Sequence, residues 1–177
     1  MTIKLTVLFI TLVLSAYFDY KYFKIKNFVV YPAILSGILI NLIISGTGGL
    51  KDSIFGTIVP FITLFLLYAL RFLGAGDVKL FSAIGAIMGM EFGIYCMAHS
   101  FLFGAFLALL IMIKRKNFFE RFKKLFLYLR NSFILMKFEK YQEFGGEKSG
   151  IFRFSYAILG GAIITVIHQL TIGLYIV

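Results

Sequence analysis

Hydrophobic residues along this chain fall into long runs that are separated by short polar or glycine-containing segments. Most of the runs approach the roughly 20 residues that a helix needs to cross a bilayer. The predicted helices are approximately Ile3–Phe18, Phe28–Ser45, Ser53–Phe72, Leu80–Met90, Phe92–Ile113 and Phe154–Val177. The pattern therefore predicts an all-α integral membrane protein with about six transmembrane helices, in which residues 1–177 form a single membrane domain.

The division between the fourth and fifth predicted helices depends on one charged residue. Glu91 is the only charged residue between Lys79 and Lys114. The apolar stretch is too long for one crossing but sufficient for two short ones. We place a turn at Gly89–Gly93, because glycine permits tight backbone geometry and Glu91 prefers water.

The distribution of basic residues supports an even number of crossings. Lys and Arg number 18, against 8 Asp and Glu, for a net charge of +10. If both termini lie outside, 16 of the 18 basic residues fall in three inner loops, as the positive-inside rule predicts for a plasma-membrane protein. Membrane topology thus accounts for the positive charge, and no nucleic-acid partner is predicted.

The longest inner loop, residues 116–150, predicts a cytoplasmic amphipathic helix. Apolar residues recur there at three- and four-residue spacing, with basic residues between them. Such a helix lies in the headgroup layer and favours anionic lipid. The apolar positions are Phe118, Phe122, Leu125, Phe126, Leu129, Phe133 and Met136. A glycine-rich segment, 145–150, predicts a flexible joint before the last helix.

Two acidic residues, Asp19 and Asp77, each follow an apolar run and both fall on the predicted cytoplasmic side. An acid at a membrane boundary is costly and therefore marks a functional site. Two carboxylates brought close together share a proton, so one can take a proton from water while the other donates to a carbonyl oxygen. Gly74 and Gly76, just before Asp77, would let backbone approach the site, and their lack of side chains would leave room for an extended substrate. The pair predicts peptide hydrolysis by an aspartyl mechanism.

Other interpretations of the two acids remain open at this point. Each Asp could cap its neighbouring helix, or both could carry protons or cations in a small transporter. A non-catalytic assembly factor would also fit the hydrophobic pattern. A cation site lacks further ligands nearby, and the single Cys96 excludes a cysteine-clustered zinc site. We predict no metal and no cofactor.

The motifs around the acids resemble those of the type 4 prepilin peptidases. Gly74–Leu80 reads Gly-Ala-Gly-Asp-Val-Lys-Leu, which matches that family's Gly-x-Gly-Asp-Val-Lys-Leu motif. Its first motif has an Asp followed at plus six by Ile-Pro-Asn, and here Asp19 is followed by Ile25–Asn27, with Lys26 in place of the proline. A weaker similarity to the family's Phe-Ala-Pro-Ala segment begins at Phe154.

The resemblance implies catalytic roles for Asp19 and Asp77. The substrate would be a prepilin or pilin-like precursor, cut at the cytoplasmic face after a glycine that ends a short basic leader. A peptidase-only form is expected, because the paired cysteines of methylating members are lacking. Presenilin-like enzymes share Gly-x-Gly-Asp but not the Val-Lys-Leu continuation. Asn27 is expected to cap the second helix, and Lys79 either to bind a substrate carboxylate or to anchor its helix at the membrane surface.

Overall fold

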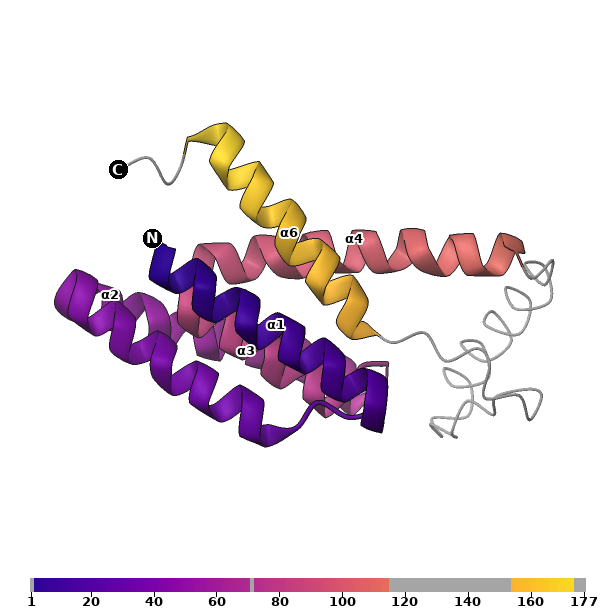
Figure 1. Ribbon diagram of the computed structural model, residues 1–177, viewed down its shortest axis with the longest axis horizontal. Coiled ribbons are helices and arrows are strands. Elements are labelled where there is room, and N and C mark those ends of the chain that lie inside the picture. The colour runs from indigo at the N-terminus through magenta and orange to yellow at the C-terminus, as the bar shows by residue number, and fades with distance from the viewer. Residues whose placement is uncertain (1, 71, 115–153, 174–177) are drawn as a thin grey trace. The chain divides into compact units, whose positions relative to one another are not determined.

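The computed structural model describes residues 2–70, 72–114 and 154–173, and within these ranges it contains helices and no strands (Figure 1). The helices are α1 (Thr2–Tyr22), α2 (Asn27–Ala69), α3 (Ala75–Met88), α4 (Met90–Lys114) and α6 (Phe154–Ile172). By length and composition, α1, α2, α4 and α6 each hold a stretch that could cross a membrane. The chain is therefore a multi-pass α-helical membrane protein. The predicted amphipathic helix and glycine-rich joint of 116–150 lie outside the described residues.

The chain divides into two compact units, residues 1–104 with 153–177, and residues 105–152. Both acids, Asp19 and Asp77, belong to the first unit. In the second unit, the described part is the continuation of α4 as far as Lys114.

Helix α2 covers both the second and the third predicted helices and is interrupted at Gly46 (φ 58°, ψ −141°). Asn41 and Ser53, on opposite sides of Gly46, donate hydrogen bonds to the same carbonyl oxygen, that of Ala86, at 2.9 and 2.6 Å. A straight helix would separate residues 41 and 53 by about 18 Å. The chain therefore reverses at Gly46, where the backbone conformation favours glycine. The predicted loop of several residues is reduced to this one position.

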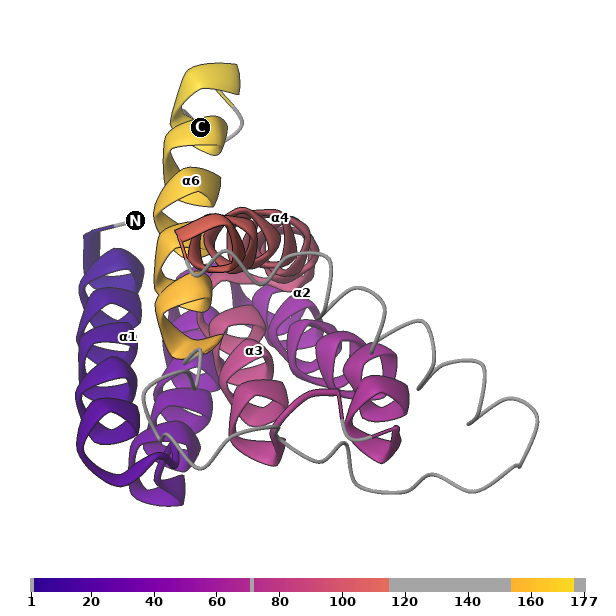
Figure 2. The same ribbon diagram turned by 90° about the vertical axis from the view of Figure 1, so that its right-hand side faces the viewer.

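Both arms of α2 pack against α3, the most buried helix of the first unit (Figure 2). Every residue from Leu80 to Met88 is buried. Close approach is possible because the contacts involve glycine: Gly56 of α2 lies against Gly85 of α3, and a Cβ atom at Gly37 would stand 2.7 Å from the Ala86 backbone. At 14 residues, α3 is shorter than a full crossing requires.

Polar side chains of α2 satisfy the backbone where α3 ends and α4 begins. The Asn41 amide donates to the carbonyl oxygens of Gly37, Ala86 and Ile87 at 2.9–3.0 Å. Asp52 accepts a hydrogen bond from the backbone N–H of Met90 at 3.0 Å. The predicted turn over Gly89–Gly93 is shorter in the structure, because the capped α4 begins directly after Gly89.

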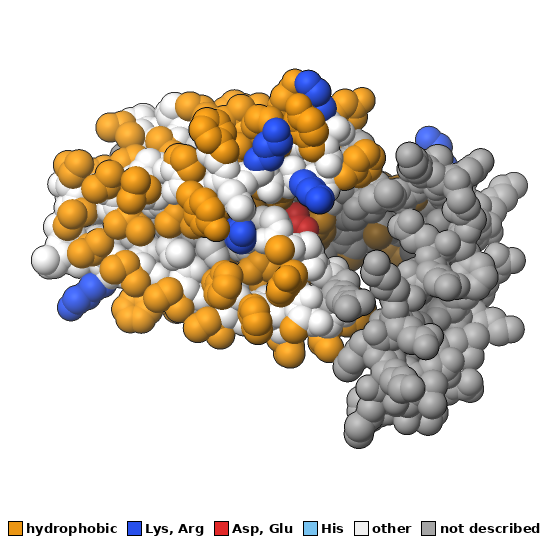
Figure 3. All heavy atoms as spheres, turned by 90° about the horizontal axis from the view of Figure 1, so that it is seen from below, with side chains coloured by type: hydrophobic (Ala, Val, Ile, Leu, Met, Phe, Trp, Pro, Cys, Tyr) orange, Lys and Arg blue, Asp and Glu red, His pale blue; other side chains and the backbone are white. Residues whose placement is uncertain are grey.

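The described surface is rich in exposed hydrophobic side chains; Phe28 and Ile43, for example, are 80% and 81% exposed. Figure 3 shows one such face, where hydrophobic side chains predominate and some of the basic side chains lie near a small acidic patch. An apolar surface of this extent is unusual for a protein in water and typical of one facing lipid. The basic residues near the acids mark a polar end of the first unit.

Candidate active site

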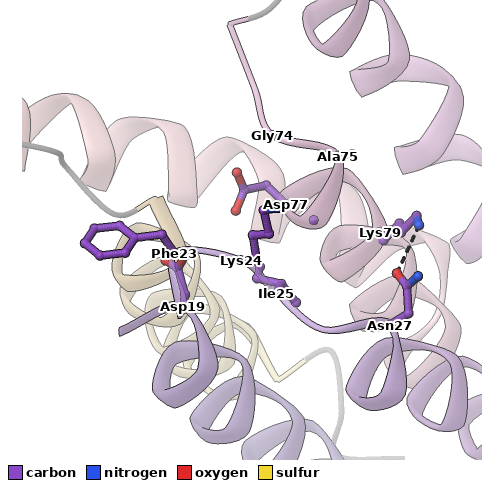
Figure 4. Close-up of a pocket in the computed structure, with 10 residues that line it drawn as sticks. Asp19, Phe23, Lys24, Ile25, Asn27, Gly74, Ala75, Asp77 and Lys79 are labelled. Carbon is purple, nitrogen blue, oxygen red and sulfur yellow. Dashed lines mark hydrogen bonds between the residues drawn. The ribbon is translucent and has the colours of Figure 1, made fainter. Parts of the chain in front are cut away.

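Asp19 and Asp77 line one pocket of about 340 Å³, at the C-terminal end of α1 and the N-terminal end of α3 (Figure 4). The two acids come from separate helices, and the segment joining α1 to α2 forms another side of the pocket. The lining residues are Asp19, Phe23, Lys24, Ile25, Asn27, Gly74, Ala75, Gly76, Asp77 and Lys79. All six residues singled out from the sequence as catalytic or groove positions thus lie around the same pocket.

Asp19 lies within α1, and the prediction that it follows the helix was wrong. The helix continues to Tyr22, because aromatic residues at a membrane interface can stay helical beyond the apolar run. The backbone N–H of Phe23 then donates to the Asp19 carbonyl oxygen at 3.0 Å, and Phe23 has φ 55°. A left-handed residue commonly ends a helix, but it is usually glycine. The bulky Phe23 in this strained conformation was not foreseen.

Asp77 lies in the first turn of α3, which begins at Ala75. The sequence pattern predicted a loop between Phe72 and Leu80, so the helix begins earlier than expected. Gly74 is the N-cap, and Asp77 stands three positions after it. The Gly74 backbone N–H donates a hydrogen bond to the Asp77 carboxylate. This is the acidic half of a capping box, which starts a helix despite two glycines.

Burial, and after it the negative charge of Asp19, raises the pKa of the Asp77 carboxyl from 3.8 to about 6. The hydrogen bond from Gly74 acts in the opposite direction. Mutual repulsion of this kind requires the two carboxylates to lie near each other. A raised pKa of this kind suits the member of a carboxylate pair that has to donate a proton.

The two motif glycines fill distinct steric roles. A Cβ atom at Gly76 would lie 3.0 Å from the Cβ of Ile25, in the segment that follows Asp19. A Cβ atom at Gly74 would lie 3.0 Å from Oδ2 of Asp77. Glycine at position 76 therefore lets the two acid-bearing segments approach, and glycine at position 74 leaves the Asp77 carboxylate room to orient.

Asn27 and Lys79 pair with each other at the edge of the pocket. Lys79 Nζ donates to Asn27 Oδ1 at 3.0 Å and lies 5.5 Å from the centre of the Tyr31 ring. The prediction that Asn27 caps α2 was wrong: Lys26 is the N-cap, with no side-chain hydrogen bond, and Asn27 is the first helical residue. Lys26 has φ −78°, close to the value proline imposes, so its replacement of the motif proline leaves this backbone geometry in place.

A residue that the sequence analysis did not single out contacts Asp19 directly. The Ser155 hydroxyl, in the first turn of α6, donates to Asp19 Oδ2 at 2.5 Å. The residues are 136 positions apart, so no local pattern indicates the contact. Among the described residues, no group of three or more His, Cys, Asp or Glu is arranged to hold a metal ion.

The fold and this pocket together define a helical membrane protein with a paired-carboxylate site at one end of its helices. Comparison with family models adds a match over residues 6–109, more than half of the chain and including both acids, to the type IV leader peptidase family. The chain belongs to that family and is accordingly a peptidase of the leader-peptidase type. Searches of curated proteins and of solved structures returned no match.

Proposed function

We propose that this protein is an aspartic endopeptidase that removes the short basic leader of a type IV prepilin or pilin-like precursor. The observation that carries the proposal is the pairing of Asp19 and Asp77 around one pocket, with the pKa of Asp77 raised to about 6. Family membership supports a peptidase of this type. Hydrolysis by activated water requires one acid to take a proton and a second acid to donate one, and a carboxylate pair can supply both.

In the proposed reaction, ionised Asp19 takes a proton from water while protonated Asp77 donates to the scissile carbonyl oxygen. Water adds to the carbonyl carbon and gives a tetrahedral intermediate. Collapse of the intermediate breaks the C–N bond, Asp19 passes its proton to the leaving amine, and Asp77 recovers the proton from the hydroxyl. No bond forms between enzyme and substrate, and both acids return to their starting protonation states.

The surroundings of the pocket favour a substrate whose scissile bond lies at a membrane boundary. The pocket adjoins the polar end of helices whose flanks are apolar, so an apolar substrate helix could stay in lipid while its leader enters. We propose that glycine at the end of the leader suits this narrow site between the α1–α2 segment and the first turn of α3.

We place the site at the cytoplasmic face of the plasma membrane. Lys21, Lys24, Lys26 and Lys79 belong to the pocket end of α1, α2 and α3, and basic residues favour the cytoplasmic side. The 43 residues of α2 would extend about 65 Å if straight, roughly twice the hydrocarbon thickness, so its two arms can each cross. With the apolar stretch Leu80–Met90 as a short additional crossing that begins after Asp77, six spans result. Binding of anionic lipid by residues 116–150 stays a prediction from sequence.

Co-expression of the protein with a tagged precursor tests the proposed reaction. The precursor carries a basic leader ending in glycine, and processing is followed by the mass of the product. Asp19→Asn and Asp77→Asn should each abolish processing. Asp52→Asn should leave processing intact, because Asp52 is a residue of α2 that contacts Met90, far along the chain from the pocket end of α3. Processing retained by either site variant would remove that acid from the mechanism. A chelator should have no effect, and loss restored by one divalent metal would favour a cation site instead.

A further inference from the structure

The Ser155–Asp19 hydrogen bond joins the last described helix to the proposed catalytic pair. Ser155 is 2% exposed, and its hydroxyl lies 2.5 Å from Oδ2 of Asp19. A buried hydroxyl that donates to a carboxylate makes a short, strong, charge-assisted bond. If Asp19 were absent, the buried Ser155 hydroxyl would lose its hydrogen-bond partner and its desolvation would no longer be compensated. The hydrogen bond between the two side chains should therefore contribute to stability.

The position of Ser155 is fixed by its neighbour in the chain. The ring of Phe154 packs against those of Phe81 and Phe101, with centroids 6.3 and 5.4 Å apart. Phe81 is four residues after Asp77, one helical turn further along α3. One aromatic cluster therefore holds the start of α6 against the helix that carries Asp77, while Ser155 reaches the helix that carries Asp19.

We propose that Ser155 is a positioning residue for Asp19. Its hydroxyl holds Oδ2, which fixes the carboxylate plane and leaves Oδ1 as the oxygen that takes a proton from water. The contact between α1 and α6 thus prepares Asp19 to act as the base, while Asp77 acts as the acid. This inference rests on the proposed function, because it concerns how the same acids work.

The test compares three substitutions at position 155 in purified protein, with kcat and KM measured on the glycine-leader precursor. Ser155→Ala removes the donor, and Ser155→Thr keeps the hydroxyl. Ser155→Cys keeps nearly the same size but offers only a weak donor. Ser15→Ala is the matched control, because Ser15 is a fully buried serine of α1, one turn before Asp19, whose hydroxyl has no partner among the described residues.

We expect Ser155→Ala and Ser155→Cys to lower kcat about tenfold or more with KM nearly unchanged. A misoriented Asp19 carboxylate affects the chemical step rather than substrate binding. Thr should restore most of the rate, and Ser15→Ala should match the wild type. Wild-type kcat in Ser155→Ala would overturn the inference. Equal losses in all three variants would overturn it too, because they would indicate packing rather than the hydrogen bond.

A second measurement does not depend on activity. Thermal unfolding of Ser155→Ala, Asp19→Ala and the double variant forms a cycle that isolates the contact between the two side chains. Ser155→Ala should lower the melting temperature in the wild-type background and much less when Asp19 is absent. Additive effects would show that the hydrogen bond does not form. A clear coupling in a protein whose wild type cleaves no precursor would instead refute the proposed function, and with it the positioning role of Ser155 in that reaction.

Discussion

Replacing Asp77 by Asn should stabilise the folded protein at neutral pH while abolishing its activity. In the folded state the Asp77 carboxyl holds its proton up to a pKa of about 6, compared with 3.8 for an ordinary aspartate. Above that pKa the folded protein must keep a charged group that is partly buried and faces Asp19. Asn has nearly the same shape and carries no charge, so the variant avoids this cost.

The size of the effect follows from the pKa difference. One pKa unit corresponds to 1.36 kcal/mol, so the shift from 3.8 to about 6 sets an upper value of about 3 kcal/mol. Because Asp77 is partly exposed, solvent screening reduces the expected gain to about 1–3 kcal/mol. At about 2–4 °C per kcal/mol for a chain of this size, the melting temperature should rise by several degrees.

The sign of the pH dependence is fixed by proton linkage. A pKa raised on folding means that the folded state binds the proton more tightly than the unfolded state. The wild type is therefore free of this penalty below about pH 4, loses stability between about pH 4 and 6, and carries the full penalty above that range. The advantage of Asp77→Asn should be near zero at pH 4 and reach its maximum above pH 6.

Melting curves of the purified protein in detergent, recorded from pH 4 to 8, test this reasoning. Asp52→Asn is the control, because Asp52 is exposed and lies at the other end of α3, where its carboxylate caps Met90. It should not reproduce the gain in melting temperature that Asp77→Asn shows at pH 7. If Asp77→Asn gives no gain at pH 7, or its largest gain at pH 4, the Asp77 carboxyl is not held in the environment described.

Two further predictions concern packing and access. Asn41→Ala should destabilise the protein by about 2–4 kcal/mol, because it removes hydrogen bonds to three carbonyl oxygens and leaves a buried cavity; an unchanged melting temperature would exclude this role. Gly74→Ala should lower cleavage about tenfold with little change in melting temperature, because the added methyl lies 3.0 Å from Oδ2 of Asp77; wild-type cleavage would show that the carboxylate needs no such space.

Hydrophobic pattern was a good guide to the helical membrane character and a poor guide to helix ends. Asp19 and Asp77 were placed in loops, although both lie within helical turns. The error came from treating the last apolar residue as the last helical one. Interfacial residues such as Tyr20 and Tyr22 continue α1, and Asp77 itself helps to start α3 through the Gly74 backbone.

Two features could not be predicted because they depend on contacts between distant segments. The reversal at Gly46 is confined to one residue, and the hydrogen bonds of Asn41 and Ser53 to Ala86 reveal it only in three dimensions. Ser155 lies in the segment with the weaker family similarity, but that similarity gives no indication of a contact with Asp19, which depends on α6 lying beside α1. The Gly-x-Gly-Asp motif, in contrast, is local in sequence, and the structure places its residues around one pocket with Asp19.

The most direct test of the central claim is cleavage of a prepilin with a glycine-ended leader by the purified protein in lipid vesicles, with wild type beside Asp77→Asn. Products are identified by mass spectrometry. The account predicts that the wild type alone releases the leader, and that the leader ends at the glycine. Absence of cleavage by folded wild type across several precursors, or equal cleavage by Asp77→Asn, would contradict it.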